Sequence, residues 1–332
     1  MKLDYVHRSR LSDLSPVVDV AWVGPARIFV GFSSGLIELT DVEERKLLTS
    51  FTLEQTTLLG LSPVDGSRIL VQTTKQSGAV SLYQYDVWRC LWTVSTKTAA
   101  SFAKPVVANN KTACVVSHDQ ATLSLINLDT GYVEKTVNIC ELVPVAKGMI
   151  AALAVADVFF VLMESGHLIS LTESGNVVHF SQIAFPNSES CVPTSLCVGG
   201  NKNYFHIVGF SSGHLDKIHV GNKSEPLFDV PGGVGAIVLC RDNVIAGSWK
   251  GRLFDSDGKI EDQPHYAGIV KLALDPGETR LAVGSLDGRV SLFFIDEVFF
   301  YLLFDFSFSI QSKGPYVVLH EIPSDLDRGP CL

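Results

Sequence analysis

Residues 284–293, GSLDGRVSLF, carry the pattern that decides the fold. An apolar run precedes this stretch, and every second residue from Val290 to Phe294 is apolar, as in a half-buried β-strand. Asp287 and Gly288 between the two runs form the strongest short-range signal for a β-hairpin, because glycine tolerates the backbone that such a turn needs. The stretch therefore predicts two antiparallel strands joined by a tight turn.

The same turn recurs along the chain at a nearly constant interval. Some copies have two glycines separated by three residues after an apolar run, and looser copies keep only the turn residue before an alternating strand. The turn residues are Gly35, Gly78, Gln120, Gly166, Gly213, Gly251 and Gly288. Intervals of about forty residues that contain only strand periodicity are typical of the four-stranded blade of a propeller. The sequence therefore predicts an all-β, seven-bladed β-propeller.

Composition narrows the class of protein further. A length of 332 residues suits one closed ring, so we expect a single propeller domain over residues 1–296. No apolar run reaches the ~18 residues that a membrane span needs, and the first residues do not resemble a secretory signal. The net charge of -9, without a basic block, argues against nucleic acid as the primary partner. Seven cysteines without a CxxC pair favour a reducing compartment, the cytoplasm or also the nucleus, and disfavour a zinc site.

The first residues of the chain form an alternating segment ahead of the first complete blade. In a closed propeller the last blade is commonly completed by a strand from the other end of the chain, because an open ring leaves unpaired sheet edges. Leu3, Tyr5 and His7 have the spacing of such a strand. We therefore expect residues 2–7 to close the ring, although the sequence alone leaves this open.

The last blade resembles a WD40 repeat. That family places a histidine four residues before an apolar strand residue, and a Ser-x-Asp turn before a strand that ends in Trp-Asp. The matching residues here are His265, Ile269, Ser285 and Asp287, whereas Phe293-Phe294 takes the place of Trp-Asp. In the family the residues that match His265, Ser285 and Asp287 form a structural hydrogen-bond network. The resemblance therefore implies a structural network here and not a catalytic triad.

The order of features over residues 15–294 is most similar to a small intracellular member of the WD40 family. This likeness implies a scaffold without enzymatic activity or cofactors. It further implies work with a co-chaperone complex in the maturation of very large phosphatidylinositol-3-kinase-related kinases, with other proteins as partners and neither nucleic acid nor a membrane.

Two alternatives to such a scaffold remain open. One is a membrane-associated or regulatory propeller that uses the Phe-rich tail, residues 297–332. The other is a propeller hydrolase. The Phe-rich composition of this tail allows three interpretations: the final outer strand, a segment that binds a membrane or a partner, or a noncoding stretch that was translated in error.

Two patterns imitate chemical sites. Residues 31–35 and 209–213, both GFSSG, match the G-x-S-x-G elbow of hydrolases. That elbow requires a turn from strand to helix, and strand patterns follow both copies, so we expect no nucleophile at Ser33. His214 and His219 are five residues apart on a predicted strand and so face opposite sides, which argues against one metal site.

A partner-binding face is predicted at the turns between the second and third strands. In WD40-like blades these turns open on the same rim as the link that leads into each blade. Phe32, Phe210, Trp249, Lys250 and Leu286 should then gather on one face. Trp249 is the strongest candidate, because Trp is enriched in interface hot spots and a turn does not need so large a ring. The alternative is that Trp249 packs against the adjacent blade and that Phe32 and Phe210 are buried.

Overall fold

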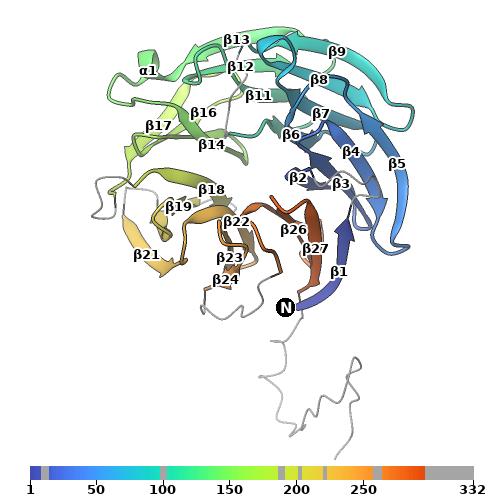
Figure 1. Cartoon of the computed structure of the whole chain (residues 1–332). Coiled ribbons are helices and arrows are strands. Elements are labelled where there is room, and N and C mark those ends of the chain that lie inside the picture. Colours follow the sequence, from blue (N-terminus) through green and yellow to red (C-terminus); the bar gives the residue numbers. More distant parts are fainter. Residues whose placement is uncertain are drawn as a thin grey trace, which may run out of the picture. The chain divides into compact units, whose positions relative to one another are not determined.

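A computed structural model describes residues 1–8, 15–97, 103–185, 191–200, 204–219, 223–256 and 264–295. They lie in one compact unit, Met1–Ile295; the second unit, Asp296–Leu332, contains the Phe-rich tail and lies outside the described residues. Within the first unit the strands form seven sheets arranged in a ring around a central channel (Figure 1). The predicted seven-bladed β-propeller is confirmed.

The blades follow one another along the chain, and each is an antiparallel meander. Blade 1 contains β2 (Val17–Trp22), β3 (Arg27–Phe32), β4 (Leu36–Asp41) and β5 (Lys46–Thr52). Blade 2 contains β6 (Leu58–Pro63), β7 (Arg68–Thr73), a 3-10 turn (Lys75–Ser77), β8 (Ala79–Gln84) and β9 (Arg89–Ser95). Blade 3 contains β10 (Val106–Ala108), β11 (Thr112–Ser117), β12 (Thr122–Asn127) and β13 (Val133–Asn138), followed by α1 (Ile139–Leu142).

The remaining blades repeat this plan. Blade 4 contains β14 (Ile150–Val155), β15 (Phe159–Met163), β16 (His167–Leu171) and β17 (Val177–Gln182). Blade 5 contains β18 (Pro193–Gly199), β19 (Phe205–Phe210), β20 (His214–His219) and β21 (Ser224–Asp229). The described part of blade 6 contains β22 (Val234–Cys240), β23 (Asn243–Ser248) and β24 (Leu253–Asp255). Blade 7 contains β25 (Ile269–Leu274), β26 (Arg280–Ser285), β27 (Arg289–Phe294) and the N-terminal β1 (Lys2–Arg8).

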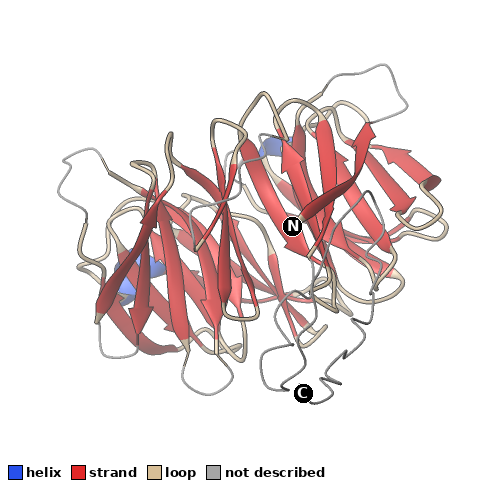
Figure 2. Cartoon of the chain, turned by 90° about the horizontal axis from the view of Figure 1, so that it is seen from below, coloured by secondary structure: helices blue, strands red, loops and turns tan. Residues whose placement is uncertain are grey.

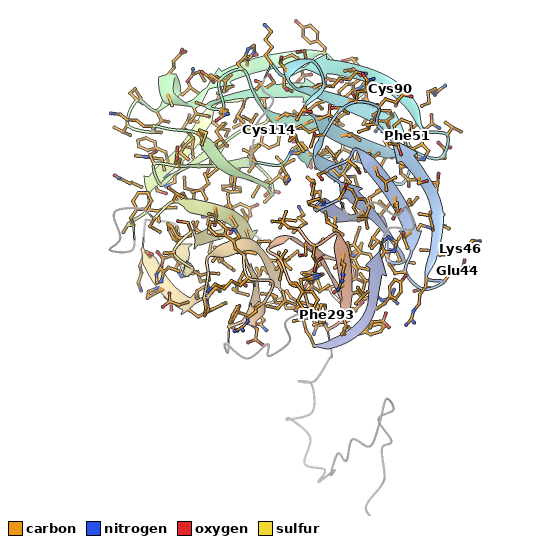
Figure 3. The ribbon with its side chains drawn as sticks, in the orientation of Figure 1. Glu44, Lys46, Phe51, Cys90, Cys114 and Phe293 are labelled. Atoms are coloured by element: carbon orange, nitrogen blue, oxygen red, sulfur yellow. The ribbon has the colours of Figure 1, made fainter. Side chains whose placement is uncertain are left out.

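The burial of the strands changes from the channel outward. In blade 3 every residue of β11 is buried, because neighbouring blades cover both faces of this strand. Outer strands such as β5 alternate between exposed and half-buried residues. Figure 3 shows this contrast: Lys46 of β5 lies at the periphery, whereas Cys114 of β11 lies inside the ring. Seen from the side, the strands run between two rims at which the turns gather (Figure 2).

The hydrophobic core is divided among the seams between adjacent blades. In the part of the chain that the structure describes there are seven such clusters, and each combines residues of two neighbouring blades. One of them joins Val20 and Val30 of blade 1 to Ala282 and Val290 of blade 7. No blade therefore buries its apolar faces by itself, and the stability of each depends on both neighbours.

The turn residues inferred from the sequence have one backbone feature in common. All have a positive φ: Gly35 87°, Gly78 116°, Gln120 65°, Gly166 74°, Gly213 98°, Gly251 77° and Gly288 76°. At Gly213 a Cβ atom would lie 2.0 Å from the carbonyl oxygen of Val230, so that position admits only glycine without a backbone shift. The repeat that the sequence predicts is thus a repeat of left-handed turns.

The ring is closed by β1, as the alternating N-terminal segment predicts. This strand pairs antiparallel with β27, from Lys2 opposite Phe294 to Arg8 opposite Arg289. The two strands lie side by side at the seam between the ends of the propeller (Figure 1). From β1 the buried His7 also reaches blade 1, where its Nε2 lies 2.8 Å from the Glu38 carboxylate. β1 therefore completes blade 7 and at the same time joins it to blade 1.

A buried carboxylate reinforces the same region from the channel side. Asp19 of β2 is fully buried, and its Oδ2 accepts a hydrogen bond of 2.9 Å from the backbone N–H of Leu61 in blade 2. Its Oδ1 accepts from the N–H of Val20 at 3.0 Å and lies 3.4 Å from Nζ of Lys271 in blade 7. Asp19 thus connects blades 7, 1 and 2 around one side chain.

Candidate partner-binding rim and channel

The turns between second and third strands are tied to the links that lead into the blades. The first turn residue donates from its backbone N–H to the carbonyl oxygen of the link. These bonds are Ser33 to Pro16 (2.9 Å), Thr74 to Thr57 (3.0 Å), Glu164 to Met149 (2.8 Å), Ser211 to Val192 (2.9 Å), Trp249 to Gly233 (3.1 Å) and Leu286 to Gly268 (2.9 Å). Turns and links therefore share one rim, which we call the upper rim.

The predicted partner-binding residues fall into two groups on this rim. The rings of Phe32 and Phe210 are only 1% and 0% exposed, because each ends a second strand at a position that faces the seam with a neighbouring blade. Their side chains pack in the core, as the alternative interpretation held. Trp249 and Leu286 are each 48% exposed, and Lys250 is also exposed. The hypothesis is thereby narrowed to these three side chains.

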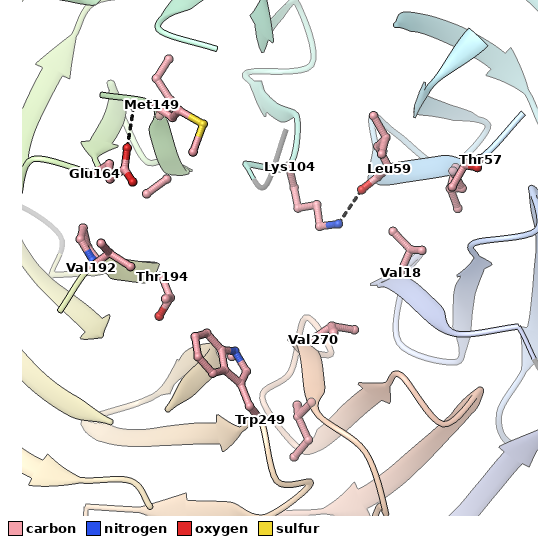
Figure 4. A pocket seen from close by; sticks show the side chains of 16 residues that line it. Val18, Thr57, Leu59, Lys104, Met149, Glu164, Val192, Thr194, Trp249 and Val270 are labelled. Carbon is pink, nitrogen blue, oxygen red and sulfur yellow. Dashed lines mark hydrogen bonds between the residues drawn. The ribbon is translucent and has the colours of Figure 1, made fainter. Parts of the chain in front are cut away.

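Trp249 is held on one face and open on the other. Its ring lies over the link into its own blade: a Cβ at Gly233 would come within 2.6 Å of the ring, and a Cβ at Gly235 within 3.0 Å. Both glycines therefore leave room for the indole. Figure 4 shows Trp249 reaching into the mouth of the channel. The ring is positioned by packing on its own blade while much of its surface stays accessible.

One further aromatic side chain of the upper rim was missed from the sequence. Tyr266 is 83% exposed, and the Arg289 guanidinium carbon lies 5.5 Å from the centre of its ring. Its backbone N–H donates to Oδ2 of Asp287 at 3.2 Å. Tyr266 could have been identified from its position directly after His265, in the link that leads into the last blade.

The central channel contains a cavity of about 640 Å³, and Trp249 and Glu164 of the upper rim are among the residues that line it. The wall consists of the starts of the first strands and of the links before them, and most of it is aliphatic. Its charged side chains are Lys104, on the link into blade 3, and Glu164, in the turn of blade 4. A second hollow of about 320 Å³ shares Lys104 with the first and is also lined by Lys271. The two hollows are thus adjacent parts of one channel.

Lys104 is the most unusual charge of this channel. Its Nζ donates to the carbonyl oxygen of Leu59 at 2.5 Å, a bond drawn in Figure 4. Burial lowers the pKa of the Lys104 ammonium below its ordinary value; the Asp19 carboxylate opposes this shift and Lys271 adds to it. No motif marks this residue in the sequence, so the sequence analysis did not identify it.

The residues that resemble the WD40 network do form hydrogen bonds with one another. Nδ1 of the buried His265 lies 3.1 Å from Asp287, and since a carboxylate can only accept, this nitrogen carries the proton. The backbone N–H of Asp287 donates to Oγ of Ser285 at 3.3 Å, and that Oγ donates to the carbonyl of Ala267 at 3.0 Å. Burial lowers the pKa of His265, while Asp287 opposes the shift. The network joins the link and the turn of blade 7.

Asp287→Ala should lower the free energy of unfolding by about 1–3 kcal/mol, because Asp287 accepts hydrogen bonds from buried His265 and from two backbone N–H groups. Chemical denaturation measures this difference. Ser33→Ala is the matched turn substitution in blade 1 and should cost less than about 0.5 kcal/mol. Equal losses in the two variants would contradict a structural role of the network.

The patterns that imitate chemical sites stand in ordinary blade positions. Each GFSSG turn is followed by a strand, β4 after Ser33 and β20 after the second copy. His214 lies between Asp229 (2.8 Å) and Asp216 (3.0 Å), whereas His219 lies 3.4 Å from Glu225. Among the described residues, no three His, Cys, Asp or Glu side chains are grouped as metal ligands. The cysteines within the described ranges are free, and no helix there is long and apolar enough to cross a bilayer.

The geometry of the ring defines the class of protein: a seven-bladed β-propeller, an arrangement consistent with the WD40 type. No protein family matches the chain, and no curated protein matches it either.

Proposed function

We propose that the protein is a non-enzymatic scaffold that captures another protein on its upper rim, with Trp249 as the anchor. The observation that carries this proposal is the placement of the indole. It is fixed on one side by the backbone of Gly233 and is 48% exposed at the mouth of the channel. A ring that is already ordered loses little conformational entropy on binding, which favours an interface hot spot.

Neighbouring side chains support the same face. Leu286 and Tyr266 are exposed on the upper rim beside blade 7, and Lys250 follows Trp249 in its turn. Apolar and aromatic groups of this kind, surrounded by polar ones, are typical of the centre of a protein interface. The upper rim thus combines an aromatic anchor with a polar border.

The kind of partner is proposed from the resemblance of the sequence. The order of features is most similar to the WD40 protein called guanine nucleotide-binding protein subunit β-like protein 1. The points of likeness are residues 15–17, 35–37, 251–254 and 282–285. This likeness supports a role with a co-chaperone complex in the maturation of phosphatidylinositol-3-kinase-related kinases, in the cytoplasm or nucleus.

Depletion of the protein from cells should then lower the steady-state levels of these kinases, and unchanged levels would contradict this role.

Trp249→Ala should weaken partner capture by about 2 kcal/mol, roughly thirtyfold, and should change the melting temperature little. The measurement is affinity purification of the full chain with quantitative mass spectrometry of what is bound. Tyr132→Ala is the matched control, because Tyr132 is 70% exposed in the turn between the third and fourth strands of blade 3. It should leave capture unchanged.

Two results would count against a rim scaffold. If Trp249→Ala binds the same partners at the same level, the partner surface lies elsewhere. If the variant instead melts at a much lower temperature, the indole of Trp249 stabilises the fold and does not serve as the binding anchor. An esterase activity that disappears with Ser33→Ala would contradict the non-enzymatic proposal.

A further inference from the structure

We infer that the channel below the upper rim receives the carboxylate end of an extended segment of the partner protein, and that Lys104 binds this carboxylate. The inference rests on the proposed scaffold function and names the chemistry of the segment. The juxtaposition that points to it is a partly buried ammonium in a mostly aliphatic channel, on the wall that faces the exposed Trp249 (Figure 4).

The size and wall of the channel favour a narrow apolar occupant. A volume of about 640 Å³ lies within the range of pockets that enclose small ligands. Such a space can hold the last few residues of an extended chain. The aliphatic wall, with Val18, Ile150 and Val270 among its residues, suits apolar side chains.

The charges of the channel favour a carboxylate. Lys104 and Lys271 both line the second hollow, and none of the described residues of its wall is acidic. The nearby Asp19 is fully buried behind it, already accepts hydrogen bonds from the backbone N–H groups of Val20 and Leu61, and forms an ion pair with Lys271. The centre of the channel therefore has an excess of positive charge.

Lys104 has donors left for a ligand. A lysine ammonium has three N–H donors, and within the described ranges its hydrogen-bond acceptor is the Leu59 carbonyl oxygen. Partial burial disfavours the charge of this ammonium, and the Asp19 carboxylate offsets part of that cost. A carboxylate at this point would add charge-assisted hydrogen bonds in a poorly solvated site.

Glu164 sets the direction in which the segment lies. It is the acidic side chain of the wall at the upper rim, where its Oε2 accepts from the backbone N–H of Met149 at 3.3 Å. An anion is repelled at this position and attracted at Lys104. The carboxylate therefore points inward, and the preceding residues pass Glu164 and Trp249 on the way out.

The test uses the full chain and a display library of hexapeptides with free C-termini. Enriched peptides are resynthesised as free acids and as C-terminal amides, and their Kd values are measured by fluorescence polarisation. We expect the amides to bind about tenfold or more weakly, and the Lys104→Met protein to lose a similar factor for the acids. Lys104→Arg should retain binding. Lys147→Met removes an exposed lysine of the link into blade 4 and should change nothing.

Several outcomes would overturn the inference. They are no enriched peptide, equal binding of acid and amide to the unmodified protein, or equal binding by Lys104→Met. The acid and amide comparison needs no variant and so holds even if Lys104→Met folds poorly. Binding of sodium octanoate at Lys104 without any peptide would assign the channel to small carboxylic acids.

The failure of this inference can be told apart from failure of the scaffold. Capture of cellular partners that falls with Trp249→Ala but not with Lys104→Met would leave the upper rim as the binding surface and exclude the channel. If neither substitution changes the capture of cellular partners, both the upper rim and the channel are excluded as binding surfaces.

Discussion

A chain that lacks residues 1–8 should lose more than about 3 kcal/mol of its free energy of unfolding and should aggregate. β1 supplies the outer strand of blade 7, so its removal exposes the full edge of β27. Exposed edges of this kind pair with other chains. The truncation also removes the buried hydrogen bond between His7 and Glu38, and the loss of a buried hydrogen bond costs about 1–3 kcal/mol. Denaturant titration and light scattering measure the two effects.

Arg45→Ala provides the control for the closing strand. This substitution removes the ion pair of 3.0 Å between Arg45 and Asp4 of β1, which lies at the surface. Exposed pairs contribute at most about 1 kcal/mol, so the variant should remain folded and monodisperse. A truncated chain that unfolds at the same denaturant concentration as this control would show that the ring does not need β1.

Asp19→Ala, behind the channel wall, should lower the free energy of unfolding by about 3–5 kcal/mol. It removes the acceptor of two backbone N–H groups and the close anion of Lys271. Because these partners belong to three successive blades, the variant should also unfold less cooperatively. Calorimetry measures both the midpoint and the width of the transition.

Two variants show whether burial causes this loss. Asp19→Asn keeps one oxygen acceptor and the shape of the side chain, so it should retain part of the stability. Asp65 accepts from the backbone N–H groups of Ser67 and Arg68 and from the Arg68 side chain, but it lies nearer the surface. Asp65→Ala should therefore cost only about 1 kcal/mol. Equal losses at Asp19 and Asp65 would contradict the argument.

Much of the fold could be predicted from the sequence because the turns place local requirements on the backbone. The left-handed turns demand glycine at most repeats, and the positions chosen from spacing, from Gly35 to Gly288, all have a positive φ. Gln120 has the same conformation without glycine, and it was found from the alternating strand that follows. The closing strand was found by its period of two, but the register shift between Leu3 and Tyr5 in its pairing with β27 could not be predicted from that period.

The channel could not be predicted in the same way. Asp19 and Lys271 lie near opposite ends of the described chain and meet only because the ring closes. Lys104 stands in no motif, and its position in the channel depends on how seven links converge. Burial of Phe32 and Phe210 was likewise undecided, because each ring packs in a seam against residues of a neighbouring blade, which the GFSSG pattern does not specify. Contacts between distant residues leave no local pattern to read.

Closure by β1 also has a consequence for biosynthesis. This strand leaves the ribosome before every other described strand of the ring, yet its partner runs to Phe294. At about 5–20 residues per second, the ribosome needs roughly 15–60 s to make the chain between them. During this time β1 cannot pair with β27, and the nascent propeller stays open. The last step of folding must therefore follow the synthesis of blade 7, and it joins the oldest segment of the ring to the youngest.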